Sequence, residues 1–229
     1  MKFLKFTILA LTLAAGVAVA TQARADNFHL GPNNGTSITF NTDGTTGTSQ
    51  TYTGGSWGDG SPPTDWSTLN GQILPWVFCV DLGHTIGSPD DYNATTVTNT
   101  GYVHGSLVNN AAAIAYVLSN FATAGVDSAA VQGAIWVLEY GNNAATVTAI
   151  GGSTSDSRVA LANLYVTDAR NYAGPSLISQ FAWLSPMKPG DTTLYQGLVT
   201  IVVPEPASFA IAGLAGLGML SYVRRRRGR

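Results

Sequence analysis

The sequence predicts an α+β fold with β-rich, sandwich- or barrel-like strands at both ends of the body, a central helical subdomain and a C-terminal transmembrane helix. Residues 26–73 are rich in Gly, Thr, Ser and Asn and contain short alternating pieces, "TSITF" and "TSQTYT", typical of strands joined by turns. The middle third changes to a helical period, and residues 193–203, "TLYQGLVTIVV", are apolar and β-branched. Disorder is the alternative for the N-terminal stretch.

The N-terminus has the three parts of a secretory signal peptide. Residues 1–25 place two lysines before an apolar run from Phe6 to Ala20, followed by Ala23-Arg24-Ala25 as an A-x-A cleavage site. We therefore expect an exported protein, cleaved after Ala25 or, failing that, after Ala20.

The C-terminus has an apolar stretch and a basic end. Residues 207–223 form a 17-residue apolar run, at the short end of what spans a bilayer as a helix. Basic residues follow it, which should hold this end on the cytoplasmic side and leave the body outside. These residues are Arg224, Arg225, Arg226 and Arg227.

The triplet Pro204, Glu205 and Pro206 precedes this run. In that order of parts, residues 204–229 resemble the PEP-CTERM sorting signal of Gram-negative bacteria. The resemblance implies processing by an exosortase, a membrane transpeptidase-like enzyme acting near the triplet. The chain would then use the secretion machinery, pass through an inner-membrane intermediate held by its C-terminal helix, and end at the cell surface or in the extracellular matrix.

The body, residues 26–203, is large enough for one domain and is acidic. It has three basic and twelve acidic residues, a net charge of −9, which argues against binding to nucleic acid. Residues 90–95, "DDYNAT", group oxygen ligands but lack the glycine and distal glutamate of a calcium loop, so we predict a turn there. No metal site or cofactor is expected.

The central elements can be placed from their patterns. Residues 74–82, "LPWVFCVDL", suggest a strand buried on both faces. A first helix is expected within residues 106–125, with Gly125 as its stop. A second follows within 127–141, capped by Asp127 and stopped by Gly141, and a third within 155–174.

Cys79 is the only cysteine of the chain. A buried structural thiol is the ordinary explanation for it. An intermolecular disulfide is a second one in an exported protein, and a hydrolase nucleophile with His84 or His104 as its base is a third.

A fourth explanation comes from two motifs within residues 74–142. The first motif is Phe78-Cys79, and the second is the run "VQGAIW" at residues 131–136. They resemble the Cys-Gln thioester domains of bacterial surface adhesins, in which an aromatic residue precedes the cysteine and a hydrophobic-Gln-x-x-hydrophobic-Trp pattern carries the glutamine. The resemblance implies a thioester between Cys79 and Gln132. Phe78, Ile135 and Trp136 would shield it from water.

The implied function is covalent attachment to an amine- or hydroxyl-bearing partner. Because such a bond is used once, we do not expect an enzyme. The adhesins are found on Gram-positive surfaces whereas this tail is of the Gram-negative kind, so attachment within a biofilm or exopolysaccharide matrix is expected. The alternative is a structural envelope or matrix protein with an inert buried cysteine.

Overall fold

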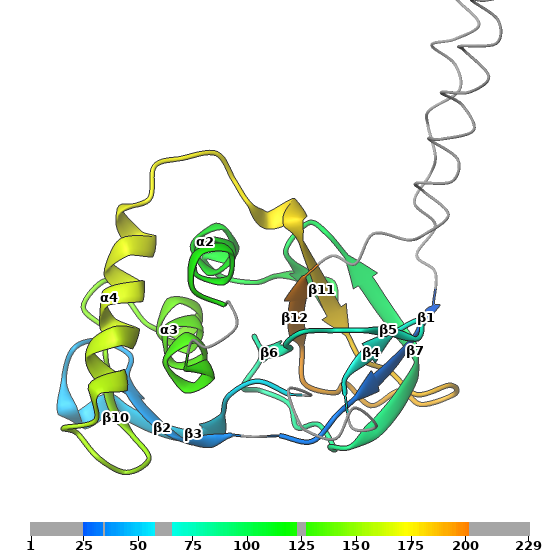
Figure 1. Cartoon of the computed structure of the whole chain (residues 1–229), viewed down its shortest axis with the longest axis horizontal. Coiled ribbons are helices and arrows are strands. Elements are labelled where there is room, and N and C mark those ends of the chain that lie inside the picture. Colours follow the sequence, from blue (N-terminus) through cyan, green and yellow to red (C-terminus); the bar gives the residue numbers. More distant parts are fainter. Residues whose placement is uncertain (1–24, 34, 58–65, 123–126, 202–229) are drawn as a thin grey trace, which may run out of the picture.

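A curled antiparallel sheet of seven strands forms one half of the molecule (Figure 1). The computed structural model describes residues 25–33, 35–57, 66–122 and 127–201. The sheet order is β5-β4-β1-β7-β11-β12-β6. In chain order its strands are β1 (Ala25–Leu30), β4 (Thr68–Leu69), β5 (Gln72–Ile73), β6 (Phe78–Cys79), β7 (Asp90–Thr98), β11 (Phe181–Ser185) and β12 (Leu198–Ile201).

The other half combines three helices with a second sheet. The sheet has the order β10-β2-β3, with β2 (Thr36–Asn41), β3 (Ser49–Gly54) and β10 (Val147–Ile150). The helices α2 (Ala111–Phe121), α3 (Ser128–Tyr140) and α4 (Ser157–Asn171) pack against one another above it (Figure 1). The small hairpin β8 (Tyr102–Val103) and β9 (Ser106–Leu107) and the 3₁₀ turns η1 (Thr46–Thr48) and η3 (Ile178–Gln180) complete the described elements.

Helix α3 lies between the two halves and contacts both. It packs against α2 and α4, against the three-stranded sheet, and against β6 of the seven-stranded sheet. Every residue from Ala129 to Leu138 is buried, as expected for a helix enclosed on all sides. Gly133 permits this close packing, because a Cβ there would lie 3.0 Å from Val147 Cγ2 on β10.

The three predicted helices are confirmed, and their ends follow the capping signals. The Asp127 side chain accepts a hydrogen bond of 2.9 Å from Ala129 N at the start of α3, and Gly141 is the C-cap. The alternating pieces of the N-terminal stretch form β2 and β3, and the final apolar run contributes β12. α2 ends at Phe121; the expected stop at Gly125 lies outside the described residues.

Three expectations need correction. Only Phe78 and Cys79 of the predicted strand 74–82 are in a strand, because Pro75 has no N–H to give to a ladder. The predicted turn at 90–95 is the first part of β7, a nine-residue strand between β1 and β11. The helices form no separate subdomain, because β10 lies between α3 and α4 in the chain and pairs with β2.

The two predicted terminal signals lie largely outside the described residues. This holds for residues 1–24 of the signal peptide and for the whole apolar run 207–223. Ala25, the predicted cleavage position, is the first residue of β1. Among the residues that the structure describes, no helix combines the length and the apolar character needed to cross a membrane.

Candidate functional site

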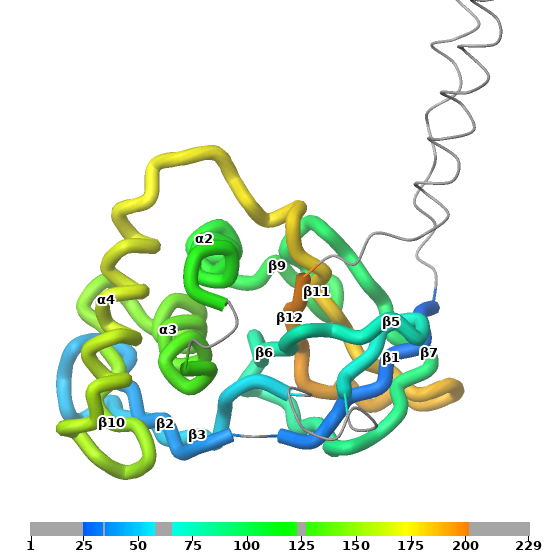
Figure 2. Tube along the Cα trace, in the orientation of Figure 1, coloured from blue at the N-terminus to red at the C-terminus, as the bar shows by residue number. Residues whose placement is uncertain are grey.

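Cys79 lies on a short edge strand that faces the helical half. β6 pairs on one side with β12, where Cys79 is opposite Leu198. It ends the seven-stranded sheet, so among the described residues no strand pairs with its other side. Figure 2 shows the tube of β6 between β12 and the helices, although β12 comes from the far end of the described chain. The main-chain groups on the open side of β6 therefore need partners from elsewhere.

Gln132 supplies those partners from α3. Its Oε1 accepts a hydrogen bond of 2.9 Å from Cys79 N, and its Nε2 donates one of 2.8 Å to Cys79 O. Both residues are 0% exposed. A buried amide must satisfy both its donor and its acceptor, and this arrangement fixes the side chain in one orientation. The Gln132 carboxamide is thus held against the residue that carries the only thiol of the chain.

The Cys79 thiol contacts main-chain atoms of Asp81. Sγ–H donates to Asp81 O at 3.1 Å, and Sγ accepts from Asp81 N at 3.3 Å. Burial raises the pKa of the thiol to about 12, while the N–H of Asp81 and the indole of Trp136 oppose part of that rise. Catalytic cysteines have lowered pKa values, whereas burial shifts the pKa of this thiol upward.

Trp136 lies one helical turn after Gln132 and is 1% exposed. Its ring packs against Phe40 and Tyr52, with centroid distances of 6.2 and 5.8 Å. Its Nε1 is buried without a hydrogen-bond partner among the described residues. An unpaired buried N–H is unusual. The indole that carries this N–H also lowers the pKa of the Cys79 thiol, against the effect of burial.

Gly54 closes the site from the side of β3. A Cβ at this position would collide with the Trp136 ring and would lie 2.8 Å from Gln132 Cγ. The glycine therefore lets the main chain of β3 approach the face of α3 that carries both side chains.

Glu139 and Tyr140 continue the same face of α3 toward its C-terminus. The Tyr140 hydroxyl accepts a hydrogen bond of 2.7 Å from Leu82 N. Burial raises the pKa of the Glu139 carboxyl to about 7, the N–H of Asn109 opposes this, and the Asp81 charge adds to it. Glu139 Oε2 is buried and, among the described residues, has no hydrogen-bond partner.

A group of polar side chains around Asp81 borders the site. Asp81 Oδ2 lies 2.6 Å from His84 Nδ1 and 3.9 Å from His104 Nε2, and the two imidazole rings are 5.6 Å apart. His104 Nε2 is also 2.6 Å from Tyr195 O. The structure thus brings both predicted histidines near Cys79. The thiol, however, is hydrogen-bonded to the main chain of Asp81 and to neither imidazole.

The other two predicted shielding residues are also buried. Ile135 is 0% exposed and Phe78 is 2% exposed. The Phe78 ring packs against Trp76, with 5.4 Å between centroids. Because neighbouring residues of a strand point to opposite faces, Phe78 covers the side of β6 away from the Cys79 side chain.

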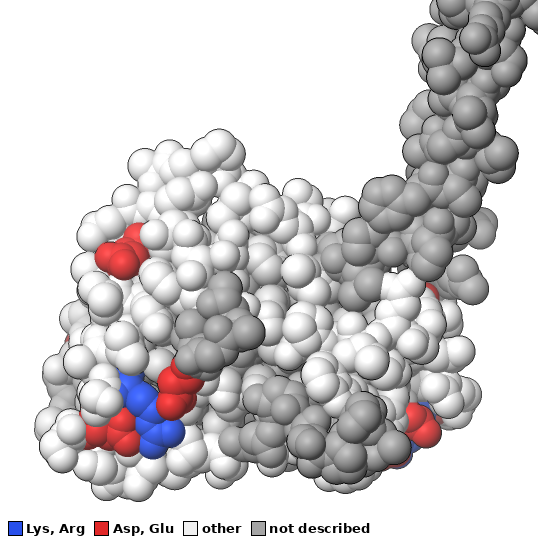
Figure 3. Space-filling view, in the orientation of Figure 1, with Lys and Arg blue, Asp and Glu red and all other residues white. Residues whose placement is uncertain are grey.

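The acidic residues of β7 form no metal site. Asp90 pairs with Lys188, and Asp91 with His29. Within the described ranges, no group of three His, Cys, Asp or Glu side chains could hold a metal ion. Charged side chains form only small groups on the face seen in Figure 3. The described residues include the ion pairs of Arg158 with Asp127 and with Asp156.

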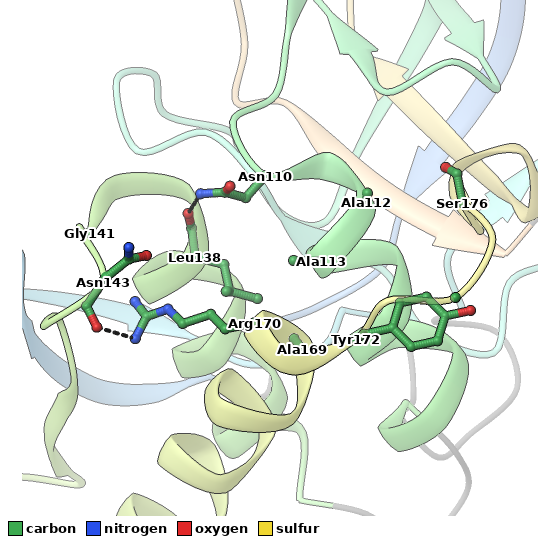
Figure 4. A pocket seen from close by; sticks show the side chains of 11 residues that line it. Asn110, Ala112, Ala113, Leu138, Gly141, Asn143, Ala169, Arg170, Tyr172 and Ser176 are labelled. Atoms are coloured by element: carbon green, nitrogen blue, oxygen red, sulfur yellow. Dashed lines mark hydrogen bonds between the residues drawn. The ribbon is translucent and has the colours of Figure 1, made fainter.

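A cavity of about 370 Å³ lies elsewhere, between α2, the C-terminal end of α3 and α4 (Figure 4). Small side chains line much of it. Arg170 lies at its edge and donates to the main-chain oxygens of Asn142 and Asn143 at 2.6 and 2.9 Å. Neither Cys79 nor Gln132 lines this cavity.

Sequence reasoning missed Gly54, Asp81 and Glu139. Glu139 was open to prediction, because it lies seven residues after Gln132 and hence on the same face of a predicted helix. Gly54 gave no such signal, since its role depends on a contact between distant segments. Asp81 lies only two residues after Cys79, but the sequence does not show that its main chain contacts the thiol.

Comparison with known proteins identifies one segment. Residues 202–227 match the family model of the PEP-CTERM protein-sorting motif. The motif supports an exported protein that an exosortase sorts at the membrane for delivery to the cell surface. No curated protein and no solved structure matches the chain.

Proposed function

We propose that this chain, whose residues 202–227 carry the PEP-CTERM sorting motif, is a cell-surface or extracellular-matrix protein that stores an acyl group as an internal thioester between Cys79 and Gln132. The thioester then acylates an amine or a hydroxyl of a surface or matrix partner. Attachment within a biofilm matrix is the use that best suits a sorted, exported body of this kind.

One observation carries the proposal. The carboxamide of Gln132 is hydrogen-bonded at both ends to the main chain of Cys79, in a fully buried site. The reactive carbon of Gln132 is therefore held against the main chain of the residue that carries the sulfur. Positioning of this kind supplies a large part of the free energy that an intramolecular acyl transfer needs.

The atoms for each step are present. The sulfur of Cys79 adds to the Gln132 carbonyl carbon, ammonia leaves, and a thioester joins β6 to α3. Cys79 N–H already points at Oε1, the atom on which negative charge develops. Burial by Trp136 and its ring neighbours would keep water from hydrolysing the product.

Intact mass spectrometry of the mature protein tests the bond directly. We expect a mass lower than the sequence by one ammonia, and no titratable thiol after unfolding. Gln132→Ala should retain a free Cys79, and Cys79→Ala should retain the Gln132 amide. A full-mass chain with a titratable thiol would disprove the thioester.

Reaction with small nucleophiles then distinguishes a thioester that acylates a partner from one that only stabilises the fold. Methylamine should open the native thioester, leaving Gln132 as the methylamide and Cys79 as a thiol. Trp136→Ala should speed hydrolysis by uncovering the bond. A thioester that resists amines and alcohols in the native protein would instead support a structural staple.

The proposed sorting route has its own test. Exosortase processing near Pro204-Glu205-Pro206 should remove the tail, so protein extracted from the cell surface should lack Arg229. Replacing Arg224–Arg227 should impair retention at the inner membrane during processing. Detection of the intact tail on surface protein would contradict the route while leaving the thioester proposal untouched.

The alternative function is a structural envelope or matrix protein with an inert cysteine. The high pKa of the Cys79 thiol is the observation that favours it. The same mass measurement decides between the two functions.

A further inference from the structure

Two polar atoms on the face of α3 that carries Gln132 are buried and unpaired. Of the three buried side-chain N or O atoms without a hydrogen-bond partner in the described residues, two are Trp136 Nε1 and Glu139 Oε2. These residues follow Gln132 at i+4 and i+7, which places them along one stripe of the helix. Unsatisfied buried groups are costly, so the presence of two of them on the helix face that carries Gln132 calls for an explanation.

From this we infer that Glu139 is the proton carrier for formation of the Cys79–Gln132 bond, and that the Trp136 N–H stabilises the sulfur as it ionises. The inference rests on the proposed thioester. It adds the group that the reaction needs and that the Cys–Gln pair alone lacks, because a thiol of high pKa must lose its proton before it attacks an amide.

The proton balance of the reaction is complete with this one acid. The Glu139 carboxylate takes the proton of Cys79 Sγ–H, directly or across one water. Sulfur bonds to the Gln132 carbonyl carbon, and the resulting oxyanion is held by Cys79 N–H. Glu139 returns the proton to the amide nitrogen, the C–N bond breaks and ammonia leaves. Glu139 ends as a carboxylate, and no oxidant or cofactor is consumed.

The charge of Glu139 acts on the thiol. Asp81 and Glu139 are the two carboxylates whose charges raise the pKa of the Cys79 thiol. A pKa of about 7 suits a group that must first accept and then donate a proton near neutral pH. The other groups that act on it are Asp81 and the N–H of Asn109.

The other side chains that could accept the thiol proton already have hydrogen-bond or ion-pair partners. The Asp81 carboxylate accepts from Gly83 N at 2.8 Å and from Gly197 N at 3.3 Å, and it lies 2.6 Å from His84 Nδ1. His104 Nε2 lies 2.6 Å from Tyr195 O. Glu139 Oε2, in contrast, is a buried acceptor on the Gln132 face of α3 that has no hydrogen-bond partner among the described residues.

A time course of bond formation tests the inference. Full-length wild type and Glu139→Gln are made by cell-free synthesis, and the fraction of chains lighter by one ammonia is followed by intact mass. We expect Glu139→Gln to slow bond formation by about 100-fold or more, since general acid–base groups contribute at least that much. Glu139→Asp should restore part of the rate.

Two further measurements exclude a merely structural effect. Asp127→Asn removes a carboxylate at the other end of α3 but keeps the N-cap, because asparagine caps a helix as well as aspartate does, and it should leave the rate near that of wild type. Circular dichroism checks that every variant folds. The wild-type rate should rise with pH through about 7, following ionisation of the carboxyl, and this rise should be absent in Glu139→Gln. Trp136→Phe, which keeps an aromatic ring but removes the N–H together with part of the indole, should slow the reaction less than Glu139→Gln does.

The outcomes separate the two proposals. A wild-type chain that never loses ammonia overturns the thioester and the role of Glu139 with it. A wild type that forms the bond, together with a Glu139→Gln variant that forms it equally fast and with the same pH profile, overturns the role of Glu139 alone.

Discussion

The side-chain amides of two helical residues each form hydrogen bonds to both the N–H and the C=O of one strand residue. Gln132 of α3 binds Cys79, and Asn163 of α4 binds Val147 of β10, with distances of 2.8 and 2.9 Å in the second pair. The first pair is fully buried and its strand residue carries a thiol, whereas Asn163 is partly exposed and Val147 has nothing that could react.

The comparison shows which features carry the chemistry. A two-point amide contact is an ordinary way to satisfy the main chain of a strand, as Asn163 demonstrates. What distinguishes the Gln132 site is the sulfur on the strand residue and the unpaired Trp136 Nε1 and Glu139 Oε2 on the same face of α3. Asn163 is therefore an internal control for Gln132.

The largest expected effect comes from Cys79→Ala. In this variant Gln132 retains its amide and can make both hydrogen bonds to the main chain of residue 79, but the covalent bond across a separation of 53 residues cannot form. By analogy with a disulfide that closes such a loop, we expect the free energy of unfolding to fall by about 4 kcal/mol. Denaturant unfolding measures it. A fall of about 1 kcal/mol, the cost of trimming one buried side chain, would contradict the bond.

Gly54→Ala should disturb the site without touching either reacting residue. Its Cβ would collide with Trp136 and press on Gln132, so we expect a loss of about 1–3 kcal/mol and a smaller fraction of chains with the bond. Gly47→Ala is the matched control, since an added Cβ there has no neighbour within 4 Å. Equal stabilities of the two variants would show that the close approach of β3 is unimportant.

Asn163→Ala tests the control pair. It leaves Val147 N–H and C=O without their partners, and we expect a loss of about 1–2 kcal/mol in thermal or denaturant unfolding. The mass change at Gln132 should persist in this variant. Loss of ammonia from Asn163 itself, seen in a peptide map of the wild type, would abolish the distinction between the two pairs.

The smallest effect should appear in the pH dependence of stability. The pKa of Glu139 is raised from its ordinary 4.5 to about 7 in the folded protein. The folded state therefore binds the proton more tightly than the unfolded one. This contribution to stability is complete below pH 4.5 and is lost as the pH rises through about 7. Melting temperatures of wild type and Glu139→Gln across this range should diverge; parallel curves would refute the shifted pKa.

Several features were determined by the sequence alone, because they depend on neighbours along the chain. The caps and the 3.6-residue period specified α3 from Asp127 to Gly141, and the two motifs singled out Cys79 and Gln132 before any contact was known. The PEP-CTERM motif is likewise a linear signal, and the match to residues 202–227 confirms it.

Only the tertiary structure decided how these parts meet. β6 is a sheet edge because β12, far along the chain, pairs on one side of it, and no strand in the described part of the chain pairs on the other. That open edge is what brings the Gln132 amide to Cys79. β7 was predicted as a turn because its first residues are acidic and polar, yet long-range pairing with β1 and β11 makes it a strand. The raised pKa of Glu139 likewise arises from burial between segments that only the fold brings together.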